Sequence, residues 1–261
     1  MRRSFPEIIP ELDPSSLVEL GSGDCSKISI VLSSMSRRNV SESEYIPVDV
    51  SRNAVEESCI ELSGKYPELS ISGLVADFCS QLVKVPSGGK RLFCLFGSTI
   101  GNFGPESAAS LLSGIADEME EQDRFMLGAD MCKDRSIMYR AYNDSAGVTA
   151  RFNKNILKVA GRILSVDFPG DIFRHRAFWN GNESRMEMHL EASEELILNS
   201  PFLDRPLSIS RGERIHTENS YKFTGEMIRE LAEASGMEIC RVFADSRNWF
   251  RLVEMKSARG K

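Results

Sequence analysis

The chain has 261 residues, a net charge of -6 and a pI of about 5.3. This length fits one large α/β domain with an inserted subdomain, and the acidic balance argues against nucleic-acid binding, which needs a basic face. Six cysteines are scattered singly without a C-x-x-C pair, so we expect neither a disulfide framework nor a metal site. We also find no membrane span or signal peptide in the sequence, and expect a cytoplasmic protein with a small-molecule substrate.

Short apolar runs alternate with helical patterns along most of the chain, which is typical of a doubly wound α/β sheet. The predicted strands are Ser16 to Leu20, Glu44 to Val48, Ser70 to Val75, Arg91 to Phe96, Arg124 to Ala129, Glu238 to Ala244 and Trp249 to Met255. The predicted helices between them are Cys25 to Ser34, Ser51 to Tyr66, Pro105 to Glu120 and Thr224 to Ser235.

The segment from Asp134 to Thr217 interrupts this alternation. It begins with a helical stretch, continues with the alternating pattern Arg185 to Glu191, and ends with a short strand-like run from Leu207 to Ile209. We interpret it as an inserted helix-plus-hairpin lobe over the carboxyl ends of the parallel strands, where open α/β sheets bind ligands. The expected domains are therefore residues 1–133 with 218–261, and the inserted lobe 134–217.

A glycine turn follows the first predicted strand, in the sequence Val18-Glu-Leu-Gly-Ser-Gly23, and the second strand ends at Asp49. Glycines let backbone amides approach a ligand closely, and a carboxylate after the second strand can hold ribose hydroxyls. A dinucleotide site would have a third glycine where this chain has Ser26. Because Glu19 also suits a cationic cofactor better than a pyrophosphate, we favour S-adenosylmethionine.

Two further polar clusters extend the predicted site. One is the loop Gly97-Ser-Thr-Ile-Gly-Asn102 after the fourth strand, and the other is the extended segment from Gly212 to Phe223. In the second, Glu218 and Ser220 are two residues apart and should point to the same side. Together these clusters indicate a pocket for a small zwitterion.

At these residues the chain resembles the histidine-specific, S-adenosylmethionine-dependent methyltransferase family, which includes the enzyme that methylates the α-amino nitrogen of L-histidine for ergothioneine synthesis. The resemblance implies a Rossmann-like class I methyltransferase fold with a seven-stranded sheet. The matching blocks include the glycine loop with Lys27, Tyr45-x-Pro-x-Asp49, Asp77-Phe78, Gly97 to Asn102, Asp130 with Lys133-Asp134, Ala141 to Thr149, Phe152-Asn-x-Asn155, Arg185-x-Glu-Met188 and Thr217-Glu-x-Ser220.

The resemblance also implies roles for individual residues. For the cofactor these are Gly21 and Gly23 in the loop, Lys27 on the methionine carboxylate, Asp49 on the ribose, and Asp77 with Phe78 around the adenine. For the reacting groups and the amino acid they are Gly97 and Thr99 as catalytic residues, Asn102 and Tyr142 on the carboxylate, Met188 against the ring, and Glu218 with Ser220 on the imidazole nitrogens.

Ordinary structural roles remain open for several of these residues. Asp49 and Asp77 could be helix N-caps, and Thr99 could satisfy the backbone of its own loop. Glu218 could form a surface ion pair, and Met188 could be a core residue. The histidines His175, His189 and His216 lack catalytic spacing and are interpreted as structural.

The family's members carry a further segment before the glycine loop that closes over the substrate, whereas only residues 1–15 precede the first strand here. We therefore expect this lid to be missing from the sequence. Three hypotheses follow: an α-N-methyltransferase of histidine or a histidine-like amino acid, an N-methyltransferase of another amino acid such as a tryptophan derivative, and a catalytically silent cofactor-binding subunit that lacks its lid.

Overall fold

The computed structural model describes residues 5–81, 85–86 and 88–259 of the chain. It divides into two compact units, the first formed by residues 1–131 and 223–261 and the second by residues 132–222. The division differs from the expected one because a long strand continues through Glu218 and Ser220, which keeps both residues in the second unit. Among the described residues, no helix is both long enough and apolar enough to span a membrane.

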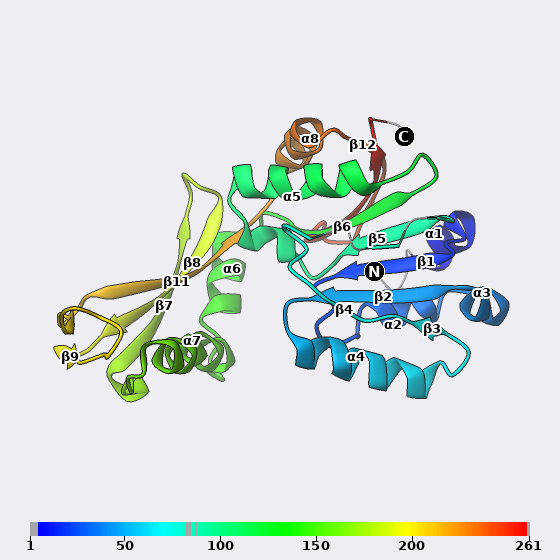
Figure 1. Ribbon diagram of the computed structural model, residues 1–261. Coiled ribbons are helices and arrows are strands. Elements are labelled where there is room, and N and C mark those ends of the chain that lie inside the picture. Colours follow the sequence, from blue (N-terminus) through cyan, green and yellow to red (C-terminus); the bar gives the residue numbers. More distant parts are fainter. Residues whose placement is uncertain (1–4, 82–84, 87, 260–261) are drawn as a thin grey trace. The chain divides into compact units, whose positions relative to one another are not determined.

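The first unit is built on one sheet with strand order β12-β13-β6-β5-β1-β2-β3, in which β4 also pairs with β2 (Figure 1). The strands from β3 to β6 are parallel, whereas β13 is antiparallel to both β6 and β12. The strand bounds are β1 Ser16–Leu20, β2 Glu44–Asp49, β3 Ser70–Ile71, β4 Leu74–Val75, β5 Arg91–Leu95, β6 Arg124–Asp130, β12 Met237–Ala244 and β13 Phe250–Ser257. This arrangement confirms the expected α/β fold class.

Helices cover both faces of this sheet, with α5 and α8 on one face and α2 and α4 on the other (Figure 1). The helix bounds are α1 Phe5–Leu12, α2 Ile28–Leu32, α3 Arg37–Glu42, α4 Arg52–Lys65, α5 Pro105–Glu118 and α8 Gly225–Ala234. Helix α2 is much shorter than predicted, because the chain stays in a loop through Cys25, which has a left-handed φ of 56°.

The predicted strand from Ser70 to Val75 is divided into β3 and β4 by a break at Gly73. A Cβ atom at Gly73 would lie 2.5 Å from Val55 Cγ1 on helix α4. A side chain therefore does not fit at this position, and the chain bends past the helix before it pairs with β2 again. The two short strands occupy one position of the predicted seven-stranded order.

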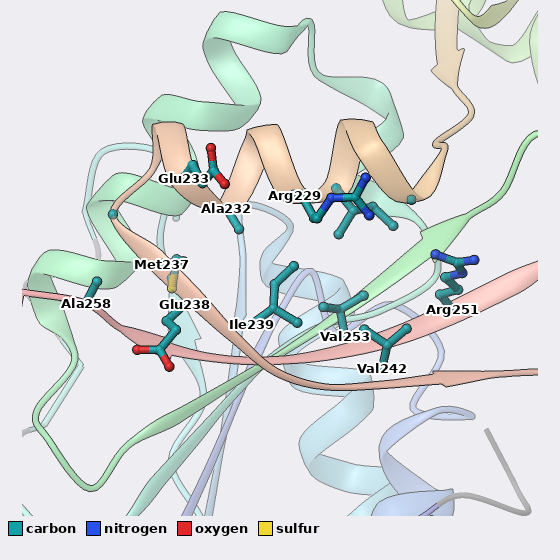
Figure 2. A pocket seen from close by; sticks show the side chains of 13 residues that line it. Arg229, Ala232, Glu233, Met237, Glu238, Ile239, Val242, Arg251, Val253 and Ala258 are labelled. Atoms are coloured by element: carbon teal, nitrogen blue, oxygen red, sulfur yellow. The ribbon is translucent and has the colours of Figure 1, made fainter.

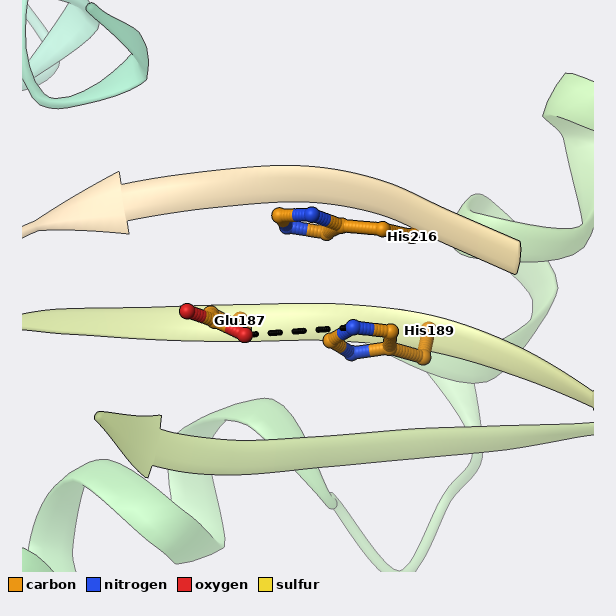
Figure 3. Close-up of side chains that lie close together, drawn as sticks. All are labelled: Glu187, His189 and His216. Atoms are coloured by element: carbon orange, nitrogen blue, oxygen red, sulfur yellow. Dashed lines mark ion pairs between the residues drawn. The ribbon is translucent and has the colours of Figure 1, made fainter. Parts of the chain in front are cut away.

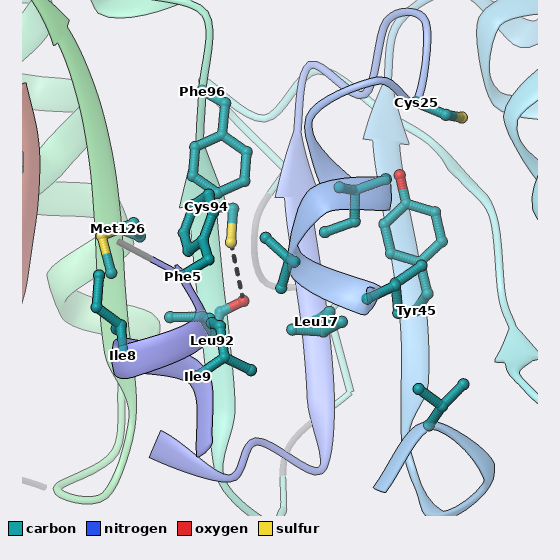
Figure 4. Packing of buried hydrophobic residues seen from close by; sticks show 14 of the residues in the cluster. Phe5, Ile8, Ile9, Leu17, Cys25, Tyr45, Leu92, Cys94, Phe96 and Met126 are labelled. Carbon is teal, nitrogen blue, oxygen red and sulfur yellow. Dashed lines mark hydrogen bonds between the residues drawn. The ribbon is translucent and has the colours of Figure 1, made fainter. Parts of the chain in front are cut away.

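Helix α1 was not predicted, yet it completes the core on one face of the sheet (Figure 4). Phe5, Ile8 and Ile9 of this helix are at most 1% exposed. The ring of Phe5 packs edge-on against Phe96 with ring centroids 5.7 Å apart. Burial of these side chains fixes the helix beneath the central strands, since each fully buried large apolar side chain contributes about 1.5–3 kcal/mol.

The second unit contains a three-stranded antiparallel sheet in the order β11-β8-β7, two helices and a two-stranded ribbon of β9 and β10. The element bounds are α6 Arg135–Tyr142, α7 Val148–Leu164, β7 Phe173–Asn180, β8 Arg185–Ala192, β9 Leu196–Leu198, β10 Leu207–Ile209 and β11 Arg214–Tyr221. The lobe is thus larger than a helix with a hairpin. Strand β7 was missed because its exposed positions interrupt the apolar alternation that identified β8.

Candidate active site

The glycine loop lies where strand β1 ends, beside the end of β2. The Gly21 amide donates to the Val48 carbonyl at 2.8 Å, and φ is +72° at Gly21 and +55° at Gly23. Such φ values favour glycine, which explains the two glycines of the motif. The glycine loop therefore lies beside Val48, the residue before Asp49, as the sequence analysis expected.

The loop brings several predicted site residues together within the first unit. A Cβ atom on Gly21 would lie 3.8 Å from Phe78 Cε1 and 4.0 Å from Thr99 Cγ2. A Cβ atom on Gly97, where φ is +71°, would lie 3.0 Å from Lys27 Cε. The segments carrying Lys27, Phe78 and Thr99, which are far apart in the sequence, therefore meet at the two glycine positions.

The two predicted aspartates make bonds to their own loops. Asp49 Oδ1 accepts the Ser51 amide at 2.9 Å, while Ser51 itself caps helix α4. Asp77 Oδ1 accepts the Cys79 amide at 2.9 Å, and this bond is the main reason why the pKa of Asp77 is lowered. Neither aspartate caps a described helix. Asp77 Oδ2 also accepts a bond from Ser80 Oγ at 3.1 Å. Each carboxylate nevertheless has lone pairs that can accept further bonds, as ribose or adenine recognition would require.

The loop after strand β5 holds Thr99 and Asn102 on a short 3-10 helix, η2 Thr99–Asn102. The Thr99 hydroxyl donates to the Phe96 carbonyl at 2.9 Å, so its proton is used locally and its lone pairs remain able to accept a bond. Asn102 is exposed at the end of the turn. The local role that we considered for Thr99 is therefore real, and it is compatible with a role in holding an amine.

Glu19 does not have the environment that we expected for a residue that attracts a cationic cofactor. It is 1% exposed and accepts a hydrogen bond from the Tyr45 hydroxyl at 2.7 Å, on the side of the sheet that carries the core in Figure 4. Burial raises the pKa of Glu19 to about 8. The carboxyl is therefore mostly neutral at pH 7 and does not supply the negative charge that we assigned to it.

The glycine loop nevertheless fits an adenosyl cofactor. The Ser22 hydroxyl between the two glycines is buried and has no hydrogen-bond partner among the described side chains. A buried polar group without a partner is costly, and a ligand in this loop would relieve that cost. Gly21 and Gly97 carry no side chain beside Phe78 and Lys27, so the backbone there can approach a ligand closely.

A cavity of about 620 Å³ lies elsewhere in the first unit, between α8 and strands β12 and β13 (Figure 2). Its apolar lining includes Ile228, Val242 and Val253. Three strands, β13, β6 and β5, separate β12 from β1 in the sheet. This cavity is therefore distinct from the glycine loop and is not the predicted cofactor site.

Four of the five predicted substrate residues belong to the second unit, and three of these four lie on two neighbouring strands. Glu218 pairs with Met188 across β11 and β8, and Ser220 pairs with Met186. Because Met186 and Met188 point to the same face of β8, Glu218 and Ser220 share that face, as predicted. Burial raises the pKa of Glu218, and Lys222 opposes the shift.

The fourth predicted substrate residue, Tyr142, joins this face through a hydrogen-bonded cluster. Its hydroxyl donates to Ser220 Oγ at 2.7 Å, and Lys222 Nζ lies 2.8 Å from both oxygens. Lys222 is 2% exposed and was missed by the sequence analysis. The signal was present, because Glu218, Ser220 and Lys222 alternate along one strand and its continuation.

The position of Tyr142 is fixed by the segment that follows it. Asp144 accepts the amides of Val148 and Thr149 at the start of α7, which lowers its pKa to about 2. His175 Nε2 lies 2.8 Å from the Tyr142 carbonyl, and its Nδ1 lies 2.9 Å from Asn153 Nδ2. His175 therefore has both ring nitrogens engaged within the lobe, which agrees with the structural role expected for it.

The family model described as "histidine-specific methyltransferase, SAM-dependent" matches residues 1–257 of the chain. A histidine N-alpha-methyltransferase of Mycolicibacterium smegmatis is 40% identical over 90% of this chain and 73% of its own length. One of Mycobacterium tuberculosis is 35% identical over 97% of this chain and 78% of its own length.

Solved structures support the fold. An S-adenosylmethionine-dependent methyltransferase from Clostridium acetobutylicum has a TM-score of 0.56 at 8% identity, over 100% of this chain and 91% of that one. The CcbJ methyltransferase from Streptomyces caelestis has a TM-score of 0.54 at 11% identity, over 98% of this chain and 90% of that one. With the family model, these findings confirm the predicted cofactor, S-adenosylmethionine, and the chain belongs to the family of S-adenosylmethionine-dependent, histidine-specific methyltransferases.

Proposed function

We propose that this protein transfers a methyl group from S-adenosylmethionine to the α-amino nitrogen of L-histidine. The observation that carries the substrate assignment is the face of β8 and β11 with Glu218, Ser220 and Lys222 beside Tyr142. Family membership and the two mycobacterial relatives, which are histidine N-alpha-methyltransferases, support the same assignment.

The chemistry of this face suits a histidine zwitterion. A half-buried carboxylate such as Glu218 needs a partner, and the N–H of an imidazole is a suitable one. The Lys222 ammonium, with the hydroxyls of Tyr142 and Ser220, offers charge-assisted donors of the kind that bind a carboxylate. We assign the imidazole to Glu218 and Met188, and the substrate carboxylate to the Tyr142 cluster.

The reaction asks mainly for positioning. S-adenosylmethionine supplies an electrophilic methyl group, and the protein must hold the amine nitrogen in line with it. In our proposal Thr99 accepts a bond from the amine, because its own proton is given to the Phe96 carbonyl. Gly97 allows the Lys27 side chain to lie close to the backbone, and Lys27 binds the carboxylate of the methionine tail.

Glu218→Gln tests the substrate assignment most directly. The amide keeps the shape of the side chain but removes its charge, and a hydrogen bond to a charged group is worth about 1.5–3 kcal/mol. We expect KM for histidine to rise by about 10- to 100-fold with a smaller change in kcat. The matched control is Glu195→Gln, which changes an exposed glutamate of the same unit and should leave KM unchanged.

The competing functions are separated by calorimetry and by mass detection of methylated products. Binding of S-adenosylhomocysteine and then of histidine supports our proposal, and the product should be N-α-methylated. Methylation of tryptophan derivatives but not of histidine would refute it in favour of the second hypothesis. Cofactor binding without methylation of any amino acid would favour the silent subunit.

We also propose that the protein acts in the cytoplasm. Cys79 and Cys240 are exposed cysteines without a disulfide bond. Unpaired surface thiols persist in reducing compartments and are rare in secreted proteins. Fractionation of cells of the source organism, with immunodetection of the native protein, would test this assignment.

A further inference from the structure

A second cluster of ionisable side chains lies on the opposite face of the same sheet in the second unit (Figure 3). Glu187 and His189 are on β8, and His216 on β11 pairs directly with His189. Each of the three offers one ligand atom, and these atoms all lie within 4.8 Å of one another. Glu187 and His189 are 7% and 9% exposed, whereas His216 is exposed, so the cluster lies at the surface of the sheet with two of its three members buried.

His216 is held in the form that a metal ligand needs. Its Nε2 lies 2.8 Å from the Asn219 side-chain oxygen, which can only accept a hydrogen bond. Nε2 therefore carries the proton, and Nδ1 keeps its lone pair. A histidine ligand whose other ring nitrogen donates to an oxygen is the usual arrangement around protein-bound metals.

His189 has an imidazole nitrogen that the described protein does not use. The ring is stacked between Phe178 and His216, with centroid distances of 4.9 and 4.5 Å. Its Nε2 lies 3.8 Å from Glu187 Oε2, and its Nδ1 is buried without a hydrogen-bond partner among the described residues.

Glu187 supplies a charged oxygen to the cluster. Its Oε1 accepts bonds from Asn180 Nδ2 at 2.8 Å and from Arg185 Nε at 2.9 Å, while Oε2 lies 3.8 Å from His189 Nε2. Burial raises the pKa of Glu187, but the bonds from Asn180 and Arg185 outweigh it and the net shift is downward. The carboxylate is thus fixed by one oxygen, and the other oxygen faces His189.

We propose that Glu187, His189 and His216 bind a divalent first-row transition-metal ion such as Zn²⁺. Two imidazoles and one carboxylate suit this class of ion, with a water molecule in the remaining position. In a tetrahedral site, metal–ligand distances of about 2.0–2.2 Å place ligand atoms about 3.3 Å apart, so rotation of the two rings has to close the cluster. Arg185 and Arg214 nearby reduce the affinity, and binding is weaker than in a closed four-ligand site.

The bound ion would link β8 to β11 without entering the methyl-transfer chemistry. Neighbouring residues of a strand point to opposite faces, so Glu187 and His189 lie on the other side of β8 from Met188. A metal ion here stabilises the strand pairing that also positions Met188 and Glu218. The proposal does not depend on the substrate assignment, because metal binding can be measured in the absence of both substrates.

The three histidines of the chain allow a direct test by NMR with ¹⁵N-labelled histidine. The metal-free, histidine-free protein is titrated with ZnCl₂ under reducing conditions. We expect the imidazole signals of His189 and His216 to change together and saturate near one equivalent. His175 is the internal control, because Asn153 and the Tyr142 carbonyl occupy both of its nitrogens. Zn²⁺ held by surface thiols would leave all three imidazoles unchanged.

Two variants identify the ligands. His216→Ala and Glu187→Gln should each weaken Zn²⁺ binding at these imidazoles by at least about tenfold. The control is Glu191→Gln on the same face of β8, whose carboxylate oxygens accept bonds from Arg176 and Arg214 instead. It should change the affinity by less than about threefold. Unchanged imidazole signals at 1 mM ZnCl₂ would overturn the proposal, since a Kd of 1 mM corresponds to about four kcal/mol of binding free energy. Equal binding by all variants would also overturn it.

Discussion

Replacing Gly97 with alanine tests the close approach at the centre of the proposed cofactor site. The residue has a φ of +71°, and the new Cβ atom would lie 3.0 Å from Lys27 Cε and 3.6 Å from Lys27 Nζ. A left-handed backbone costs a residue with a side chain about 1–2 kcal/mol. The Lys27 side chain is flexible and half-exposed, so its displacement lowers the free energy of unfolding only a little further.

Cofactor binding should be affected more than folding. In our proposal Lys27 binds the methionine carboxylate, and the added methyl group displaces Lys27 from its position. We expect Gly97→Ala to lower the free energy of unfolding by about 1–2 kcal/mol and to raise the Kd of S-adenosylhomocysteine by more than about tenfold. Urea unfolding measures the first change, and isothermal titration calorimetry measures the second.

The matched control is Gly64→Ala near the end of helix α4, where no atom lies within 4 Å of the added Cβ. Alanine is favoured over glycine in helices by up to about 1 kcal/mol, so this variant should be as stable as the parent or slightly more so. It should bind S-adenosylhomocysteine normally. If Gly97→Ala binds this ligand as tightly as the parent does, the reasoning about Gly97 and Lys27 is wrong.

Further predictions concern buried polar groups. The pKa of Glu19 is raised from 4.5 to about 8, so between these pH values the folded protein holds a proton there that the unfolded chain has lost. The stability of the parent relative to Glu19→Gln, measured in urea titrations, should therefore fall as pH rises from 4.5 to 8. A pH-independent difference between the two proteins would contradict this. Asp123→Ala leaves the Arg91 guanidinium buried without its carboxylate, and urea unfolding should show a loss of about 3–5 kcal/mol. Asn153→Ala removes the donor to His175 Nδ1 and should lower thermal stability by about 1–3 kcal/mol, with a rise in KM for histidine as Tyr142 loosens.

The parallel sheet was predictable because its strands are buried on both faces and read as continuous apolar runs. β1 begins and ends at the predicted residues, and β5 and β6 differ from the prediction by one residue at one end. The division at Gly73 was not predictable, since it depends on contact with Val55 of a helix. Helix α1 was also missed, because its few apolar positions become informative only when they are seen packed beneath the sheet.

The same distinction applies to the candidate site. Motif spacing identified Gly21, Gly97 and Thr99, which the folded loops bring near Phe78 and Lys27. Sequence reasoning failed where a residue's role depends on depth below the surface. Glu19 follows the motif, but its carboxyl lies in the core and is mostly neutral at pH 7.

Lys222 illustrates the opposite error. A lysine at the end of a polar segment is expected to be exposed to solvent, yet Lys222 is buried against Tyr142 and Ser220. Burial of a cation is costly without hydrogen-bond acceptors, so the two hydroxyls that surround it are part of the reason it is tolerated. Only the tertiary structure reveals that the proposed amino-acid site contains this charge.

A β-bulge in β11 explains how one strand can serve two different sites. Simple alternation would place His216 and Glu218 on the same face, but the register shifts between them, so that His216 pairs with His189 and Glu218 with Met188. Without the extra residue, Glu218 would lie opposite Glu187 and share its face, and the carboxylate would leave the substrate side. The Thr217 hydroxyl donates to the Met188 carbonyl at 2.8 Å and holds the irregular turn of the strand. The bulge therefore separates the polar face that we propose for the substrate from the imidazole face, and a ligand bound to either face would contact the same two strands.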